Sequence, residues 1–253
     1  MNMHNVIKKA AFVAATSIAA AAMLPASASA ATFVLSGGNN SDGSIGNVRT
    51  YTGSDGTQLE VTAYSLAGGS TLAAGAVGAY SPGLGVMNSF CTPGWFGCSG
   101  GDDSHTVDNS GNVDILVFQF NKVVTVDKIG LVSFGDTDIN YAIGSTTTPF
   151  SGTLSIPNYA AFNALFGTTI LSNGSGSDEN RDINPNNLSG NLFYVAAAFS
   201  NSGSNDSFKV SGITYTATPA VPEPATWGMM ICGLGLAGAA MRRRKANASV
   251  SFA

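Results

Sequence analysis

The densest group of oxygen-bearing side chains lies in a Gly-rich stretch, residues 100–114. Five of them fall within 13 residues, namely Asp102, Asp103, Asp108, Asn109 and Asp114. A hard cation such as Ca²⁺ takes about six to eight oxygen ligands, which carboxylates, amides and backbone carbonyls supply. No Glu closes the stretch as it would in an EF-hand loop. Two interpretations follow: a Ca²⁺ site, with Ca²⁺ as the one candidate cofactor, or Asp and Asn side chains that cap turns by bonding to their own backbone.

Residues suited to catalysis are sparse between positions 31 and 220. His105 is the single histidine there, and no Ser lies in a nucleophile-elbow context, so a structural histidine is favoured. A glycosidase needs two carboxylates at a defined separation. The two glutamates, Glu60 on a predicted strand and Glu179 in a polar stretch, lie where no raised pKa is expected. We therefore expect no enzyme, with an exported polysaccharide hydrolase as the alternative.

A short loop sequence, Thr-Pro-Gly-Trp-Phe-Gly, lies between Cys91 and Cys98. In an exported protein this spacing predicts a disulfide that closes the loop. The rival interpretation, a metal-binding pair, lacks two further Cys or His ligands at a suitable spacing. Trp95 and Phe96 fall at the tip of the loop, where they would either stack on sugar rings or be buried beneath it.

Strand-like alternation, rather than helical periodicity, organises residues 31–220. We predict a turn at Asn121, one short helix at 158–166, polar loops at 36–46 and 173–187, and a loop or irregular edge strand at 71–85. Strands are predicted at 58–65, 113–120, 123–134, 139–143, 192–199 and 208–216. This pattern favours an all-β fold, a jelly-roll-like antiparallel β-sandwich. A parallel α/β fold is disfavoured because the intervening helices are missing.

The N-terminus has the layout of a secretory signal peptide, residues 1–30. Lys8 and Lys9 precede an apolar run, and a small-residue segment ends at Ala30, where cleavage is predicted. A first transmembrane helix is disfavoured because that run is short. The signal peptide implies the secretion translocon and signal peptidase as partners. The remaining cargo domain, residues 31–220, has five basic and fourteen acidic residues, a net charge of −9. Nucleic acid is excluded as a partner because phosphates need a basic face.

The C-terminal segment, residues 221–245, has three parts. Pro222, Glu223 and Pro224 come first and cannot all be helical, since each proline pushes the preceding residue toward extended geometry. An apolar, Gly-rich run follows from Trp227 to Met241. Its fifteen residues fall short of the ~20 that span a bilayer comfortably. A basic cluster then acts as a cytoplasmic stop, before a tail at 246–253; the cluster consists of Arg242, Arg243, Arg244 and Lys245.

Taken in this order, the three parts resemble the PEP-CTERM sorting signal of bacterial exosortase substrates. The nearest variant reads Pro-Glu-Pro-x-x-Trp-Ala, and Gly228 stands in place of its Ala. The resemblance implies that an exosortase recognises this segment and processes it near Pro222–Pro224. The protein would then pass through the inner membrane transiently and reach the cell surface or the extracellular matrix. By composition alone, a permanent single-span transmembrane anchor remains the other interpretation.

The cargo domain carries a second resemblance. Gly-Leu-Gly-Val at 83–86, Ser-His-Thr-Val-Asp-Asn at 104–109 and the Phe-rich strand that follows are similar to a bacterial family of exosortase-dependent surface proteins. This resemblance implies a surface location and a β-sandwich, and it brings no activity with it. The expected function is that of a non-enzymatic surface protein that associates with extracellular polysaccharide, as in a biofilm matrix.

Overall fold

The computed structural model describes residues 29–38, 44–88, 105–148, 150, 154–199, 205–218 and 224–246. The chain divides into two compact units. One is Ala28–Thr218, which holds every described strand, and the other combines Met1–Ser27 with Pro219–Ala253.

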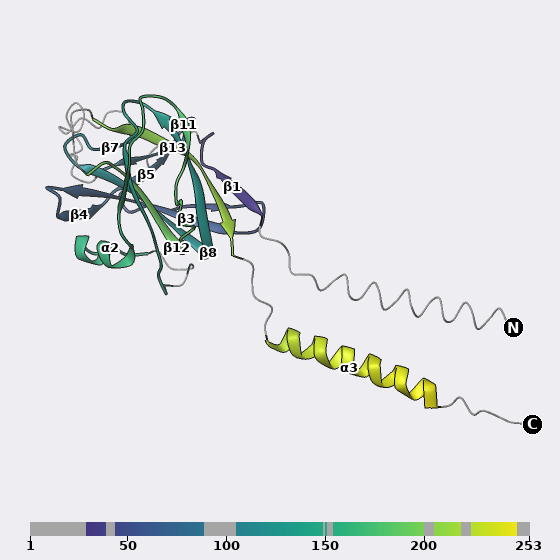
Figure 1. Ribbon diagram of the computed structural model, residues 1–253. Coiled ribbons are helices and arrows are strands. Elements are labelled where there is room, and N and C mark those ends of the chain that lie inside the picture. Colours follow the sequence, from purple (N-terminus) through teal and green to yellow (C-terminus); the bar gives the residue numbers. More distant parts are fainter. Residues whose placement is uncertain are drawn as a thin grey trace, which may run out of the picture. The chain divides into compact units, whose positions relative to one another are not determined.

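An antiparallel sheet of 13 strands makes up the first unit within the described residues (Figure 1). The strands are β1 (Ala30–Val34), β2 (Arg49–Thr52), β3 (Gln58–Ala67), β4 (Thr71–Ala74), β5 (Ala76–Ala79), β6 (Leu84–Met87), β7 (Val107–Asp108), β8 (Val113–Ser133), β9 (Ile139–Gly144), β10 (Ile170–Ser172), β11 (Glu179–Asp182), β12 (Ser189–Ala197) and β13 (Ser207–Ala217). Its main path runs β10-β9-β12-β8-β13-β6-β5, and the other strands pair with members of this path or with β3.

The 21-residue strand β8 is the central element of the sheet. Its first half pairs with β3 and with β12, so that Phe118 lies opposite Val61 on one side and Phe193 on the other. Its second half pairs with β13 and β11, and Ile129 lies opposite both Ile213 and Arg181. Four strands that are distant in sequence are therefore fixed in register by one continuous strand.

Both faces of the central strands are buried, each in its own apolar cluster. The larger cluster takes Leu116, Phe118 and Phe120 from β8, together with Val124 and further residues of its second half. The smaller cluster takes the alternate residues of the same strands and packs against α2; its members include Ile115, Val117, Leu192, Tyr194 and Phe162. A strand covered on both faces reads as a continuous apolar run, as residues 113–120 do.

The helix α2 (Tyr159–Leu165) covers the smaller cluster with Phe162, its one buried residue. Asn158 caps it, because the side-chain oxygen of Asn158 accepts a hydrogen bond from the Ala161 amide at 2.9 Å. Phe162 packs on Phe166 and Tyr194, with ring centroids 4.9 Å apart in both pairs. The helix therefore fixes the chain that leads into β10.

The first and last strands of the unit lie side by side. β1 pairs with β13 in antiparallel register from Ala30 opposite Thr216 to Val34 opposite Gly212. The ring of Phe33 on β1 stacks on the ring of Tyr215 on β13, with centroids 4.8 Å apart. The two ends of the domain thus meet at one edge position.

The second unit contains the helix α3 (Pro224–Ala246). Large apolar side chains on this helix are exposed, namely Met229, Ile231, Leu234, Leu236 and Met241. Among the helices of the described residues, none is both long enough and apolar enough to span a membrane.

The predicted all-β antiparallel fold, the helix near 158–166 and the strands from residue 58 onward are confirmed in type. The predicted turn at Asn121 is wrong: the residue continues β8, and its side-chain oxygen accepts a hydrogen bond from the Gln58 amide at 3.0 Å. The predicted loop at 173–187 contains β11, whose pairing with β8 overrides its polar composition. The strands β1, β2, β7 and β10 were not predicted.

We expect Phe118→Ala to lower the free energy of unfolding by about 3–5 kcal/mol, because the ring lies at the centre of the larger cluster and the cavity would not collapse. Thermal or denaturant unfolding measures this. Val123→Ala, in the same strand but 46% exposed, is the matched control and should cost well under half as much. Equal losses for the two variants would contradict a central role for this cluster.

Candidate functional site

Several predicted site residues lie outside the described residues. They are the proposed disulfide partners Cys91 and Cys98, the loop-tip aromatics Trp95 and Phe96, and the first two acidic residues, Asp102 and Asp103. Pro222 and Glu223 of the sorting segment lie outside them as well. The predictions for these positions stay predictions.

The other three predicted Ca²⁺ ligands are buried and bonded to protein groups. Asp108 accepts hydrogen bonds from the Ser110 amide at 2.9 Å and from the Thr106 hydroxyl at 3.1 Å. Asp114 accepts one from the Ser65 hydroxyl at 2.8 Å. The Asp108–Ser110 bond is the local turn-capping contact of the alternative interpretation. Asn109 instead reaches across the sheet, donating to Asp206 at 2.6 Å and to the Ala198 carbonyl at 3.1 Å.

Asn109 leads to a carboxylate cluster that the sequence did not predict, made of Asp136, Asp138 and Asp206. One carboxylate oxygen from each lies within 4.8 Å of the others. Asp136 and Asp138 follow the end of β8, and Asp206 immediately precedes β13. The nearby loop is held by the buried Arg181, whose guanidinium donates to the Thr137 carbonyl at 2.8 Å. These three side chains could hold a hard cation, since such ions prefer carboxylate oxygens. The sequence signal was a bare Asp-Thr-Asp, with its third member 68 positions away.

The environment of Asp206 disfavours its charge. Burial, followed by the charges of Asp138 and Asp136, raises the pKa of this carboxyl to about 6, although hydrogen bonds from Ala198 and Asn109 act in the opposite direction. Only 2% of the residue is exposed. The folded protein therefore holds the proton of Asp206 more tightly than an ordinary aspartate does.

His105 lies in a different place, where the two sequence motifs of the cargo domain meet. The Val86 amide of the first motif donates to the Thr106 carbonyl of the second at 3.3 Å. A Cβ at Gly85 would come within 1.7 Å of the His105 carbonyl, so this approach requires glycine. The His105 ring stacks on Tyr80 with centroids 5.8 Å apart, and its carbonyl accepts a hydrogen bond from the buried Lys209. These contacts fit the structural role expected for this histidine.

The two glutamates differ in their environments. Burial raises the pKa of Glu60, which corrects the expectation from its position on a strand. For Glu179, burial is outweighed by hydrogen bonds from Arg181 and Thr137 and by the charge of Arg181, which lower its pKa. Glu179 is thus held ionised, as an ion-pair partner of Arg181.

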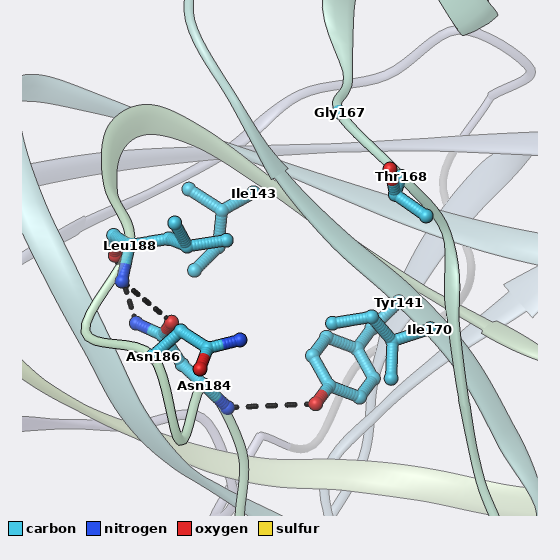
Figure 2. Close-up of a pocket in the computed structure, with 8 residues that line it drawn as sticks. All are labelled: Tyr141, Ile143, Gly167, Thr168, Ile170, Asn184, Asn186 and Leu188. Atoms are coloured by element: carbon cyan, nitrogen blue, oxygen red, sulfur yellow. Dashed lines mark hydrogen bonds between the residues drawn. The ribbon is translucent and has the colours of Figure 1, made fainter.

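A pocket lined by neutral side chains lies at the end of the sheet path that β10 and β9 form (Figure 2). Its volume is about 330 Å³. Three segments form it: β9, the chain between α2 and β10, and the turn from β11 to β12. Its lining residues are Tyr141, Ile143, Gly167, Thr168, Ile170, Asn184, Asn186 and Leu188. No charged side chain is among them.

The turn that forms one wall of the pocket is built around Asn184. The side chain of Asn184 accepts from the Leu188 amide at 2.7 Å and donates to the Leu188 carbonyl at 2.8 Å. Its own amide donates to the Tyr141 hydroxyl at 3.4 Å. Asn184 and Asn187 both adopt left-handed backbone conformations, with φ of 65° and 52°, which asparagine tolerates better than most residues. The Asn-Pro-Asn-Asn sequence at 184–187 is the signal that could have pointed to this rigid turn.

The C-terminal segment decides the broader class of the protein. Residues 220–245 match the family model described as PEP-CTERM protein-sorting motif. The chain therefore carries a C-terminal PEP-CTERM sorting motif, which marks an exosortase-sorted protein. Such proteins are exported and sorted to the cell surface, and the motif implies processing by an exosortase. The match includes Pro222, Glu223, Pro224, Trp227, Arg242, Arg243 and Arg244, the residues that the sequence singled out.

The match covers the sorting segment alone, so the resemblance of the cargo domain to surface proteins stays a prediction. Neither the curated proteins nor the solved structures contain a significant match to this chain. The function of the cargo domain therefore rests on its own geometry.

We expect the pKa of Asp206 to make stability depend on pH. Because its folded-state pKa lies above the ordinary value, the folded protein binds this proton more tightly than the unfolded chain does. The resulting stabilisation is complete below about pH 4, is lost as the pH rises through about 6, and amounts to about 3 kcal/mol.

Asp206→Asn should remove this contribution, so that the variant gains stability relative to the natural protein as the pH rises from 4 to 7. Urea unfolding at several pH values gives the free energy of unfolding of each protein. The difference between the two values removes the contributions of other titrating groups, such as Glu179, because both proteins share them. A difference that stays constant across this range would show that Asp206 titrates normally.

Proposed function

We propose that this PEP-CTERM protein is a non-enzymatic component of the cell surface or extracellular matrix that associates with neutral extracellular polysaccharide. The sorting motif at 220–245 carries the proposal, because it delivers the preceding domain outside the cell. The domain is a compact unit with a large apolar core and a net acidic charge, which suits a matrix component outside the cell.

We also propose that the sheet closes into a jelly-roll-like sandwich. Both halves of β8 contribute to the same apolar cluster, with Leu116 and Phe118 from the first half and Val126 and Leu131 from the second. A strand whose two halves face one cluster must bend around it, and strands that pass between two sheets in this way are typical of sandwiches.

The polysaccharide association is supported by the neutral pocket and by the distribution of charge. The cargo domain has a net charge of −9, which disfavours acidic polymers. The pocket combines aliphatic side chains with amide and hydroxyl groups, the combination that binds polyhydroxylated rings.

An exported hydrolase is the alternative, and the carboxylate cluster is the observation that favours it. A carboxyl with a pKa of about 6 beside two further carboxyl groups resembles the acid of a glycosidase and its partner. However, Asp206 is 2% exposed and bonded to Asn109 and the Ala198 amide, so its proton cannot reach a glycosidic oxygen without a rearrangement of β13. We therefore favour a structural role for the cluster.

We expect the mature protein recovered from the cell surface to lack the C-terminal segment, because exosortase processing is proposed near Pro222–Pro224. Mass spectrometry of its C-terminal peptide measures this. Recovery of a peptide from residues 242–253 in the surface fraction would contradict processing and favour the alternative, a permanent anchor. Glu223→Ala should leave the protein unprocessed, whereas Asn247→Ala, outside the matched motif, should not.

We expect the mature protein, collected from the host, to co-sediment with the host's own extracellular polysaccharide. The measurement is the fraction in the pellet, with and without Ca²⁺ and a chelator. Loss of binding with chelator would support a Ca²⁺ site, and binding in both conditions would place the interaction at neutral groups. No co-sedimentation in either condition would contradict the polysaccharide proposal and leave a structural or protein-binding surface domain.

A further inference from the structure

We propose that the pocket between β9, β10 and the β11–β12 turn binds a single uncharged sugar ring of the polysaccharide, an inference that rests on the proposed function and names its site. Figure 2 shows the amide of Asn186 pointing into the space between Ile143 and Tyr141. Three properties of the pocket support this assignment: its size, its chemistry and its rigidity.

The size fits one ring. The volume of about 330 Å³ lies at the lower end of the range of ~300–1,000 Å³ found for small-ligand sites. A single monosaccharide unit fills such a space, whereas an extended oligosaccharide would project out of it. The pocket opens beside exposed residues such as Thr168 and Asn186, so a ring within a longer chain can enter and its neighbours can leave.

The chemistry selects an uncharged polyhydroxylated ligand. Ile143, Ile170 and Leu188 offer apolar surface to the C–H face of a ring, and Leu188 is 50% exposed. The Asn186 amide supplies both donors and an acceptor, and the Thr168 hydroxyl supplies one more of each. A purely apolar ligand would desolvate these groups without replacing their hydrogen bonds. An anionic sugar would find no cation among the described lining residues.

The site is held rigid before any ligand arrives. Tyr141, which lines the pocket, is 3% exposed. The side chain of Asn184 closes the turn by two hydrogen bonds to the backbone of Leu188. On the opposite wall, the Gly167 amide donates to the Ile143 carbonyl at 3.2 Å, and Ile170 pairs with Tyr141 in the sheet. Side chains already fixed by the scaffold lose little conformational entropy on binding. The side chains of Asn186 and Thr168 make no hydrogen bond to another described residue, so their polar groups are available to a ligand.

The test uses the mature protein collected from the host and the methyl glycosides of glucose, galactose and mannose as probes, with methyl glucuronide as the charged comparison. Ligand-observed NMR titration gives the affinities. At least one neutral glycoside should bind, and the glucuronide should bind more weakly. Asn186→Ala and Thr168→Val should each weaken binding of the neutral glycoside by about three- to tenfold, because each removes hydrogen bonds to the ring.

Asn173→Ala is the matched control, because Asn173 is an exposed asparagine outside the lining and should leave the affinity unchanged. Neutral-glycoside binding that is equal in the natural protein and in Asn186→Ala overturns the pocket as the site. Co-sedimentation with polysaccharide but no binding of any methyl glycoside also overturns it, while the proposed function stands. Failure of both measurements overturns the proposed function together with the pocket.

Discussion

The structure depends on one strand that is buried on both faces and shared by four partners. β8 carries alternate residues into two apolar clusters and fixes the register of β3, β11, β12 and β13. A slip of one residue in β8 would exchange its two faces, and Phe118 would have to fit into the smaller cluster at the place of Val117. Every site described here lies on an element that β8 or one of its partners positions.

The two candidate sites differ in how the protein stabilises them. The carboxylate cluster is a place of unfavourable electrostatics, in which Asp206 sits buried beside Asp136 and Asp138 and is compensated by Asn109 and a backbone amide. The pocket is electrostatically neutral, and its walls are satisfied among themselves through Asn184 and Tyr141. The buried carboxyl groups of the cluster affect the stability of the fold. A preformed neutral cavity, in contrast, is suited to binding a ligand. This contrast is why the polysaccharide proposal rests on the pocket.

The sequence predicted the parts of the fold that follow from local patterns. The apolar runs at 113–120 and 192–199 and the short helix at 158–166 needed no tertiary information. The missed elements are those that tertiary pairing creates: Asn121 continues a strand because Gln58 bonds to it, and the polar β11 is a strand because β8 offers it an edge. The sites were harder for the same reason. Asp206 lies near Asp136 only in the folded protein, and the pocket combines three segments. The sorting motif, in contrast, is contiguous, so the sequence alone was sufficient to identify it.

The pairing of β1 with β13 joins the first and the last strand of the first unit. β1 begins at Ala30, next to the predicted cleavage point, and among the described strands its one partner is β13, with Thr32 and Thr214 lying 182 residues apart. A chain that crosses the membrane with its N-terminus leading carries β1 unpaired until the last strand emerges, and a contact of such sequence separation is slow to form. The sorting motif follows β13 directly, so the segment that engages the exosortase arrives together with the strand that completes the sheet. In a chain exported in that direction, delivery of the tail and closure of the domain are coupled by chain connectivity alone.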